Sequence, residues 1–424
     1  MPQQNDAAVI ATEIEKVRED VPTLFEMEGP FFNTIEKKKA DIVSARDMRV
    51  PLKIKAGGKS GGYDPDGGDM GRGGGVTYSF ATVPVVHQKM ALEWTKKAQW
   101  GTDDRRKAVV NAFKDTLADA MPQFQRDIDA WAMTGGDGVL ATADVYSVGT
   151  GTGGGDRITC NGATNGFRAN LVRDDLNVNV FDTTLATNKT LGSERTINYW
   201  DVENFIFDIF PSVAAGLATD KIVVSGVTTA PPTWLLGVPY HHNGASTGTW
   251  LGLSRVTNPQ IRASQVAAGG ALALPFPRLA LNKIANRLGQ SRMEKVQAWM
   301  HLCQKAAYEE LGQLVSIIQK APADEKLNLY FGDGMQMAGA PVKTSPKWDR
   351  TRIDFVNTDV WGRAEMTPIG FYTTSDGRKF FEVRGTSGGV VSAELIYLKV
   401  GFNMFVNNPS ACAYISGLTI PSGY

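Results

Sequence analysis

The residues with the clearest potential for chemistry lie in a glycine-rich run, KAGGKSGGYDPDGGDMGRGGG, from Lys55 to Gly75. Within it, Gly58-Lys59-Ser60 matches the end of a phosphate-binding P-loop. That loop needs a further glycine five residues before Gly58, where this chain has Lys53, and an apolar helix after Ser60, which the sequence does not predict. The pattern therefore argues against phosphate binding.

The same run contains Asp64, Asp66 and Asp69, which suggest a calcium-binding loop. An EF-hand loop starting at Asp64 should have glycine at its sixth position and glutamate at its twelfth. The residues found there are Asp69 and Gly75. The run therefore does not fit an EF-hand, and we predict no metal site in it.

A second glycine-rich segment has the spacing of a dinucleotide-binding fingerprint, with glycines at 149, 151 and 154. That fingerprint functions only when a helix N-terminus follows and faces the pyrophosphate. The following residues, DRITCNGATNG, do not form a helical pattern. We interpret the segment as a glycine-rich turn and predict no cofactor.

The four histidines are the remaining candidates for catalysis or metal binding: His87, His241, His242 and His301. Adjacent side chains of an extended segment point in opposite directions, so His241 and His242 would not chelate one ion well. His301 and Cys303 fall on a predicted helix, where residues two apart diverge. We interpret all four as ordinary polar or core histidines and predict no catalytic residue. A serine–histidine–acid or cysteine–histidine site stays open, although no Gly-x-Ser-x-Gly motif supports one.

Composition sets the general class of the protein. The chain has 424 residues, 42% of them hydrophobic, and equal numbers of basic and acidic side chains, 44 each. Disorder of the whole chain is therefore not expected, and bulk charge gives no argument for a nucleic-acid-binding protein. Three widely spaced cysteines indicate a reducing compartment, and no signal peptide or membrane span is predicted. We expect a soluble protein.

The first half of the chain shows a distinctive order of elements. The first 45 or so residues are rich in charge and read as an arm. The strand-like stretches LKIKA and VTYSFATVPVV flank the glycine run and predict a long hairpin. A short helix is predicted from Val85 to Trp100. A long helix follows at about 102–134, because apolar residues from Val109 to Trp131 recur every three or four positions. Pro122 should kink or divide it.

The second half is mixed. Short β-like runs fill 138–257, and helices are predicted from about Arg278 and again from about Arg292. Strands follow, including a hairpin IGFYTTSDGRKFFEVRG with Asp376-Gly377 as its turn. The predicted fold class is α+β.

This order of elements, with the phrases GLSRVTNPQIRA, WGRAEMTPIGFY and NPSACAYISGLTIPSGY, resembles tailed-bacteriophage major capsid proteins of the Hong Kong 97-type fold. The resemblance implies an N-terminal arm, an extended β-hairpin loop, a peripheral domain with a long spine helix, and a mixed α/β axial domain. The implied ranges are arm 1–48, extended loop 49–84, peripheral domain 85–175 with its spine helix at about 102–134, axial domain 176–345 with room for a β-rich insertion, peripheral strands 346–400, and a C-terminal axial strand segment 401–424.

The resemblance also implies function and partners. The chain would self-assemble as hexamers and pentamers into an icosahedral head shell enclosing double-stranded DNA, in the virion after assembly in the host cytoplasm. Portal, scaffolding and decoration proteins are the implied partners, without a membrane. The implied contacts are an inter-subunit extended loop with Lys55, Lys59, Tyr63 and Arg72, and an inner face that contacts DNA non-specifically. Candidates for that face are Lys37, Lys38, Lys39 and Arg46, for which a solvated charge run is the alternative interpretation.

Three other functions compete with this one at the level of sequence. A bacterial nanocompartment shell would have the same fold with an enzyme as cargo. A phage tail or decoration protein would use β-rich surfaces to form rings. A soluble α/β enzyme would use an unrecognised site within 138–320, and substituting its histidines would abolish activity.

Overall fold

The structure is a computed structural model that describes residues 28–36, 41–42, 47–62, 66, 72–96, 112–160, 168–190, 193–226, 230–318, 335–375, 377–384 and 390–422. The chain forms two compact units. The first unit comprises Met1–Asn33, Val85–Asp129 and Glu365–Phe402, and the second comprises Thr34–Pro84, Ala130–Ala364 and Asn403–Tyr424. Which ranges act as peripheral or axial domains of a shell subunit stays a prediction.

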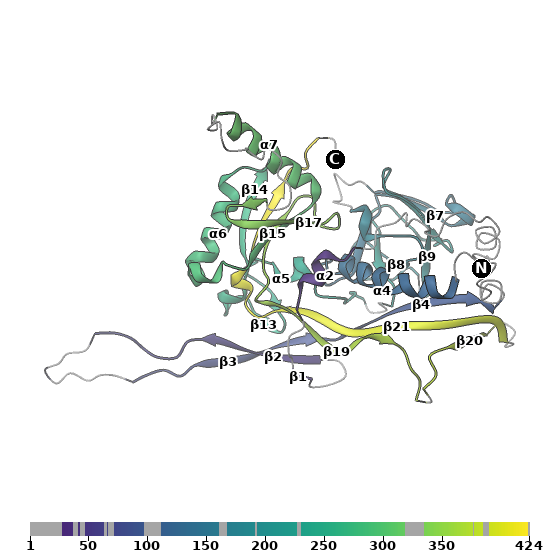
Figure 1. The fold of residues 1–424 in the computed structure, drawn as a ribbon, viewed down its shortest axis with the longest axis horizontal. Coiled ribbons are helices and arrows are strands. Elements are labelled where there is room, and N and C mark those ends of the chain that lie inside the picture. Colours follow the sequence, from purple (N-terminus) through teal and green to yellow (C-terminus); the bar gives the residue numbers. More distant parts are fainter. Residues whose placement is uncertain are drawn as a thin grey trace. The chain divides into compact units, whose positions relative to one another are not determined.

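The sheet of the first unit is built around the long strand β21 (Val390–Val406), drawn in yellow in Figure 1. Strand β4 (Val86–Thr95) pairs antiparallel with it, from Val86 opposite Phe402 to Thr95 opposite Ala393. Strands β19 (Trp361–Phe371) and β20 (Phe381–Arg384) also pair with β21.

The helix predicted from Val85 to Trp100 is wrong, because most of this segment is β4. Met, Ala, Leu, Glu and Lys give the segment high helix propensity. Its burial nevertheless alternates with a period of two, since Gln88 and Met90 are buried while Lys89 and Ala91 are exposed. Ten register pairs with β21 therefore outweigh local propensity.

The long helix is confirmed as α4 (Ala112–Trp131), and Pro122 lies inside it without dividing it. Residues 102–111 of the predicted helix lie outside the described part. Phe124 and Ile128 of its apolar stripe are buried. The short helix α2 (Pro30–Thr34) is fixed to α4 because the amide of Phe32 donates to Oδ1 of Asp129 at 2.8 Å.

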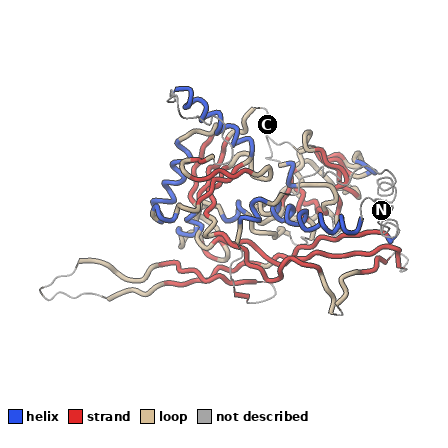
Figure 2. The backbone as a smooth tube through the Cα atoms, viewed as in Figure 1, coloured by secondary structure: helices blue, strands red, loops and turns tan. Residues whose placement is uncertain are grey.

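The predicted turn near Gly377 is present, but the predicted hairpin is wrong. The amide of Gly377 donates to the Thr374 carbonyl at 3.0 Å, which closes the turn. However, the Tyr372 amide donates to the Tyr397 carbonyl, and Phe381 lies opposite Leu395. After β19 the chain therefore leaves β21, forms a loop, and returns as β20, which pairs with β21 again. Figure 2 shows this loop projecting from the sheet.

The second unit includes the predicted long hairpin, which is confirmed. Strand β2 (Asp47–Lys55) pairs antiparallel with β3 (Thr77–Pro84), and the two-residue strand β1 (Asp41–Ile42) pairs with the start of β2. Figure 1 shows β2 and β3 running out together as a two-stranded ribbon.

A closed β-barrel follows in the second unit. Its strands are β5 (Val139–Thr142), β6 (Val145–Ser147), β7 (Asp156–Thr159), β8 (Asn177–Phe181), β9 (Arg195–Asp201), β10 (Ile206–Phe210) and β11 (Lys221–Val224). The sheet order is β5-β11-β8-β9-β10-β7-β6. Strands β5 and β6 stand at the two ends of this order, yet they follow each other directly in the chain. The two edges of the sheet therefore meet, and the sheet closes into a barrel. The amides of Ala143 and Asp144 complete the closure by donating to Asp220 and Thr159.

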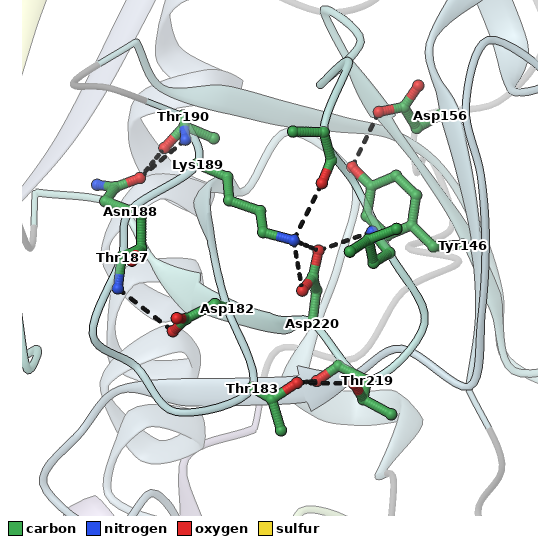
Figure 3. A network of polar contacts seen from close by, with 12 residues as sticks. Tyr146, Asp156, Asp182, Thr183, Thr187, Asn188, Lys189, Thr190, Thr219 and Asp220 are labelled. Carbon is green, nitrogen blue, oxygen red and sulfur yellow. Dashed lines mark hydrogen bonds and ion pairs between the residues drawn. The ribbon is translucent and has the colours of Figure 1, made fainter.

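Buried carboxylates fasten the loops of this barrel (Figure 3). Asp156 is fully buried and accepts from the Tyr146 hydroxyl at 2.9 Å and from the amide of Val213 at 2.6 Å. Burial, with the Asp156 carboxylate, raises the pKa of Tyr146 well above its usual value. Lys189 Nζ lies 2.7 Å from Asp220 Oδ2 and so ties two further loops together.

The remainder of the second unit is a six-stranded mixed sheet in the order β14-β22-β18-β15-β17-β16. Its strands are β14 (Ser264–Gly270), β15 (Val296–Met300), β16 (Gln336–Met337), β17 (Ala340–Thr344), β18 (Ile353–Asn357) and β22 (Ala413–Leu418). Helix α6 (Pro275–Leu288) packs Ala280, Leu281 and Ile284 into the sheet's apolar core, and α7 is Leu302–Ile318. Short elements are α5 (Val238–His241), β12 (Thr249–Trp250), β13 (Leu253–Ser254), and 3-10 turns at Thr152–Gly154, Ala169–Leu171, Pro259–Ile261, Gln290–Arg292 and Pro409–Ala411.

The two helices predicted here have different outcomes. The helix expected from about Arg278 is confirmed as α6. The helix expected from about Arg292 is wrong in its first part, because Val296–Met300 is strand β15, paired with β17 and β18. A buried apolar run of this length fits a central strand as well as a helix, and the pairing with two neighbouring strands decides between them.

Candidate inter-subunit interface

The β2–β3 hairpin contacts the rest of the second unit at several points, and much of its remaining surface is exposed to solvent. Near the base, Met48 and Val83 are fully buried, and the Thr82 amide donates to the Leu251 carbonyl at 3.0 Å. Gln260 Nε2 donates to the Ile54 carbonyl at 3.1 Å. The described residues of the hairpin beyond Ile54 are all exposed, and between the two contacts Pro51, Lys53, Tyr78 and Phe80 are exposed as well. The hairpin is therefore held at several points but presents one uncovered face.

Large apolar side chains lie on one exposed face of the hairpin, along β3. Val76, Tyr78 and Phe80 are 38%, 67% and 56% exposed. Residues two apart on a strand share a face. Exposed Lys53 and Pro51 lie opposite Tyr78 and Phe80 on β2. We call Val76, Tyr78 and Phe80 the apolar stripe. A contiguous exposed stripe of this kind is typical of a protein–protein contact.

The loop residues predicted for inter-subunit contact are not gathered into a cluster. Lys55, Lys59 and Arg72 are each exposed. Gly58 donates through its amide to the Gly74 carbonyl at 2.8 Å, which joins the two arms of the loop. Tyr63 lies outside the described residues, and so do Lys37, Lys38, Lys39 and Arg46. The roles of all these residues therefore stay predictions.

Sequence reasoning missed the apolar stripe, although a signal for it was present. The segment VTYSFATVPVV alternates, which predicts a strand, and its odd and even members define two faces. Ala81 and Val83 are buried on one face of β3, while Tyr78 and Phe80 are exposed on the opposite face. Because both faces carry apolar residues, the sequence does not indicate which face is covered.

The adjacent histidines are core residues, as predicted. His241 and His242 are both fully buried at the end of α5. Trp250 Nε1 donates to Nδ1 of His241 at 3.1 Å, so the ring proton is on Nε2, which faces the Met404 carbonyl at 3.1 Å. Burial lowers the pKa of His241 to about 3. A neutral ring with both nitrogens engaged has no free atom for catalysis.

His242 is held in the opposite tautomer. Trp361 Nε1, which can only donate, lies 3.2 Å from Nε2 of His242. The ring proton is therefore on Nδ1, 2.8 Å from Oδ1 of Asp354. Burial opposes ionisation of Asp354, but Arg352 and His242 outweigh it and lower the pKa of this carboxyl. The pair fixes the fold and is closed to substrate.

The prediction that His301 and Cys303 diverge is wrong. Nδ1 of His301 lies 3.1 Å from Sγ of Cys303, because His301 precedes α7 and its ring turns back over the first turn of the helix. Burial, with Arg350 and Arg168, lowers the pKa of His301 to about 4. Burial also raises the pKa of the Cys303 thiol. A neutral imidazole beside a buried protonated thiol is not an activated nucleophile.

The segment with dinucleotide-like spacing is a turn, as predicted. It joins β6 to β7, and Gly149, Gly153 and Gly154 have positive φ. A Cβ at Gly155 would lie 2.2 Å from the Ile209 carbonyl oxygen, so the turn needs glycine where it lies against β10. Among the described residues, no cluster of three or more potential metal ligands occurs, and no helix is long and apolar enough to cross a membrane.

These elements together define a class of fold. A long hairpin, a helix beside a sheet with one long strand, and a separate mixed sheet with helices form the Hong Kong 97-type capsid fold, of class α+β as predicted. No protein-family model and no curated protein sequence matches the chain.

Solved structures do match it. The cyanophage A-1(L) capsid asymmetric unit aligns over 95% of this chain and 96% of its own, with a TM-score of 0.55 and 13% identity. The capsid of a native GTA particle covers 95% of this chain and 94% of its own, with a TM-score of 0.47 and 11% identity. The holo-SrpI encapsulin complex of Synechococcus elongatus covers 98% and 97%, with a TM-score of 0.47 and 8% identity. The first of these likenesses establishes the fold.

Proposed function

We propose that this protein is the major capsid protein of a tailed phage, which self-assembles as hexamers and pentamers into the icosahedral head shell around double-stranded DNA. The observation that carries the proposal is the likeness along almost the whole chain to a subunit of the cyanophage capsid. The bare hairpin supports it independently, because a protruding two-stranded ribbon buries surface only against another molecule.

The apolar stripe would supply part of the contact free energy. Burying a large apolar side chain completely contributes about 1.5 to 3 kcal/mol. Tyr78 and Phe80 are 67% and 56% exposed in the isolated chain. Covering both would therefore contribute about 2 to 4 kcal/mol for each hairpin. Because every copy in a shell would make the same contact, these modest contributions would add up and stabilise the particle.

The remaining partners belong to the same proposal. Lys55, Lys59, Tyr63 and Arg72 would make polar contacts around the stripe. Lys37, Lys38, Lys39 and Arg46 would face the packaged DNA. Portal, scaffolding and decoration proteins would complete the head, which would assemble in the host cytoplasm and persist in the virion. The protein would act as a structural component and not as an enzyme.

The test is assembly of the purified protein, alone and with a co-expressed scaffolding protein, observed by negative-stain electron microscopy. Wild-type protein should form closed isometric particles. The double variant Tyr78→Ser and Phe80→Ser should stay dispersed with an unchanged circular dichroism spectrum. The matched control is Leu217→Ser, which removes a 63% exposed apolar side chain from the barrel and should assemble normally.

Three outcomes would count against the proposal or against its interface. Wild-type protein that forms only rings would favour a tail or decoration protein. Closed particles without nuclease-protected DNA from infected cells would favour a compartment with another cargo. Normal assembly of the Tyr78 and Phe80 variant would remove the stripe from the interface.

A further inference from the structure

Basic side chains gather on one part of the second unit, around helix α6 and the start of β14. Between Lys221 and Glu294 the sequence has no acidic residue, although the whole chain has as many acidic as basic residues. The basic residues of that stretch are Arg255, Arg262, Arg278, Lys283, Arg287 and Arg292. A run of one charge in a neutral chain indicates an anion-binding surface where the fold brings its members together.

Three arginines of this stretch are linked through main-chain carbonyls. Nη1 of Arg287 donates to the Arg262 carbonyl at 2.8 Å. Arg262 donates in turn through Nε to the Arg255 carbonyl at 2.9 Å and through Nη2 to the Ser246 carbonyl at 3.1 Å. Arg255 is buried, and its Nη2 lies 3.5 Å from the Tyr240 carbonyl. These bonds hold the three arginines beside one another although their charges repel.

A lysine adds a fourth charge to this group. Nζ of Lys283 donates to the Gln265 carbonyl at 2.6 Å. Lys283 and Arg287 stand four residues apart on α6, so their side chains share one side of the helix. Helix α6 packs beside β14 (Figure 1), and both side chains bond to the main chain at the start of that strand. We call Arg255, Arg262, Lys283 and Arg287 the basic cluster.

No carboxylate offsets the charge of the basic cluster within the described part of the chain. Its four members form no ion pair there, and their hydrogen bonds all go to main-chain carbonyls, which carry only partial charge. Burial lowers the pKa of Arg255, and the charge of Arg262 acts in the same direction. The same two causes lower the pKa of Arg287. The isolated chain therefore keeps mutually repelling charges that a bound anion would relieve.

Donor groups remain free for such an anion. Among the described residues, Nη2 of Arg287, Nη1 of Arg262 and the buried Nε of Arg255 have no hydrogen-bond partner. Arg287 is exposed, and Arg262 and Lys283 are half-buried, so solvent reaches the cluster. Guanidinium groups bind phosphate oxygens through paired N–H groups. A phosphate carries up to two negative charges and several acceptor oxygens, which suits several cations better than a single carboxylate does.

We infer that the basic cluster binds a phosphate group, either of inorganic phosphate or of a nucleic-acid backbone. Arg287 and Arg262 would donate to the phosphate oxygens, while Lys283 and Arg255 would add charge. The inference does not depend on shell formation, so the dispersed full-length chain is sufficient to test it.

Equilibrium dialysis with radiolabelled inorganic phosphate, at constant ionic strength, tests the site. The wild type should bind phosphate in a saturable manner. Arg287→Gln should weaken that binding by about tenfold or more, because it removes a charge-assisted hydrogen bond. Lys283→Gln should act in the same direction. Circular dichroism spectra should stay unchanged in both variants.

An arginine on the same helix provides the matched control. Arg278 is also exposed, and the nine residues from it to Arg287 make about two and a half turns, which places the two on opposite sides of α6. Arg278→Gln removes the same charge from the chain but should bind phosphate like the wild type.

Thermal unfolding gives a second readout, with chloride replaced by phosphate. Phosphate also stabilises folded proteins without binding, because it is excluded from their surface. That general effect should be equal in the wild type and in Arg287→Gln. The melting temperature should therefore rise more with phosphate in the wild type than in the variant.

A fluorescent DNA oligonucleotide distinguishes the two sources of phosphate. If the site takes a nucleic-acid backbone, the oligonucleotide should bind, inorganic phosphate should compete with it, and Arg287→Gln should weaken binding while Arg278→Gln should not. If the site takes free phosphate, inorganic phosphate should bind without binding of the oligonucleotide.

Three results would overturn the inference. Arg287→Gln could bind phosphate as tightly as the wild type. Arg278→Gln could lose as much binding as Arg287→Gln, which would show a diffuse effect of charge. The wild type could bind neither probe while Arg287→Gln alters shell formation, which would assign the basic cluster to a carboxylate of another copy. Failure of the wild type to form shells would instead refute the proposed function alone.

Discussion

Acid sensitivity of the buried His241 gives the most quantitative prediction. In the folded chain its neutral ring accepts from Trp250 Nε1 and faces the Met404 carbonyl, and its pKa is lowered from 6.5 to about 3. The unfolded chain binds the proton with the ordinary pKa. Between pH 6.5 and about 3 the unfolded state therefore binds more protons, and stability falls as the pH falls.

The magnitude follows from the two pKa values. At pH 5 the unfolded histidine is almost fully protonated and the folded one is almost fully neutral. Protonation of the unfolded state then lowers the free energy of unfolding by about 2 kcal/mol relative to pH 7.5, at 1.36 kcal/mol for each unit between 6.5 and 5. His301, whose pKa is lowered to about 4, adds a loss of its own, so the His241 contribution is the difference between the wild type and a variant without an ionisable group at position 241.

The assay is urea unfolding of the dispersed subunit at pH 7.5 and pH 5, for wild type and for His241→Gln. The wild type should lose about 2 kcal/mol more than the variant between the two pH values. Trp250→Phe, which removes the N–H that opposes protonation of Nδ1, should also reduce the loss. Equal pH dependence in wild type and His241→Gln would refute the argument that a neutral buried His241 stabilises the fold.

Two further predictions concern packing. Gln88 is buried and neither polar atom of its amide has a hydrogen-bond partner, so Gln88→Met should raise the free energy of unfolding by about 1 to 2 kcal/mol in thermal or urea unfolding. A lower stability would mean that the amide has a partner in solution. A Cβ at Gly237 would lie 2.1 Å from the Ala132 carbonyl oxygen, so Gly237→Ala should destabilise by about 2 kcal/mol or more, whereas Gly61→Ala, in open space, should be neutral. Equal stability of the two alanine variants would contradict the crowding at Gly237.

Much of the fold could be predicted because its signals are local. The apolar stripe of α4, the strand flanks of the glycine run and the α6 pattern each specify an element without reference to the rest of the chain. The rejected phosphate and dinucleotide sites also depended on local spacing.

The errors occurred where distant strands decide local structure. VHQKMALEWT has helix-forming residues but becomes β4 because β21, three hundred residues later, offers a full ladder. Val296–Met300 becomes a strand because β17 and β18 flank it. Lys89 and Lys399 likewise become neighbours only through that long-range register.

Cryo-electron microscopy of particles assembled from this chain tests the central claim most directly. We expect a closed icosahedral shell of hexamers and pentamers in which the β2–β3 hairpin of each copy lies on a neighbouring copy, with Tyr78 and Phe80 covered. Open rings, or dispersed subunits under every condition with and without a scaffolding protein, would contradict the claim that this protein is a head-shell subunit.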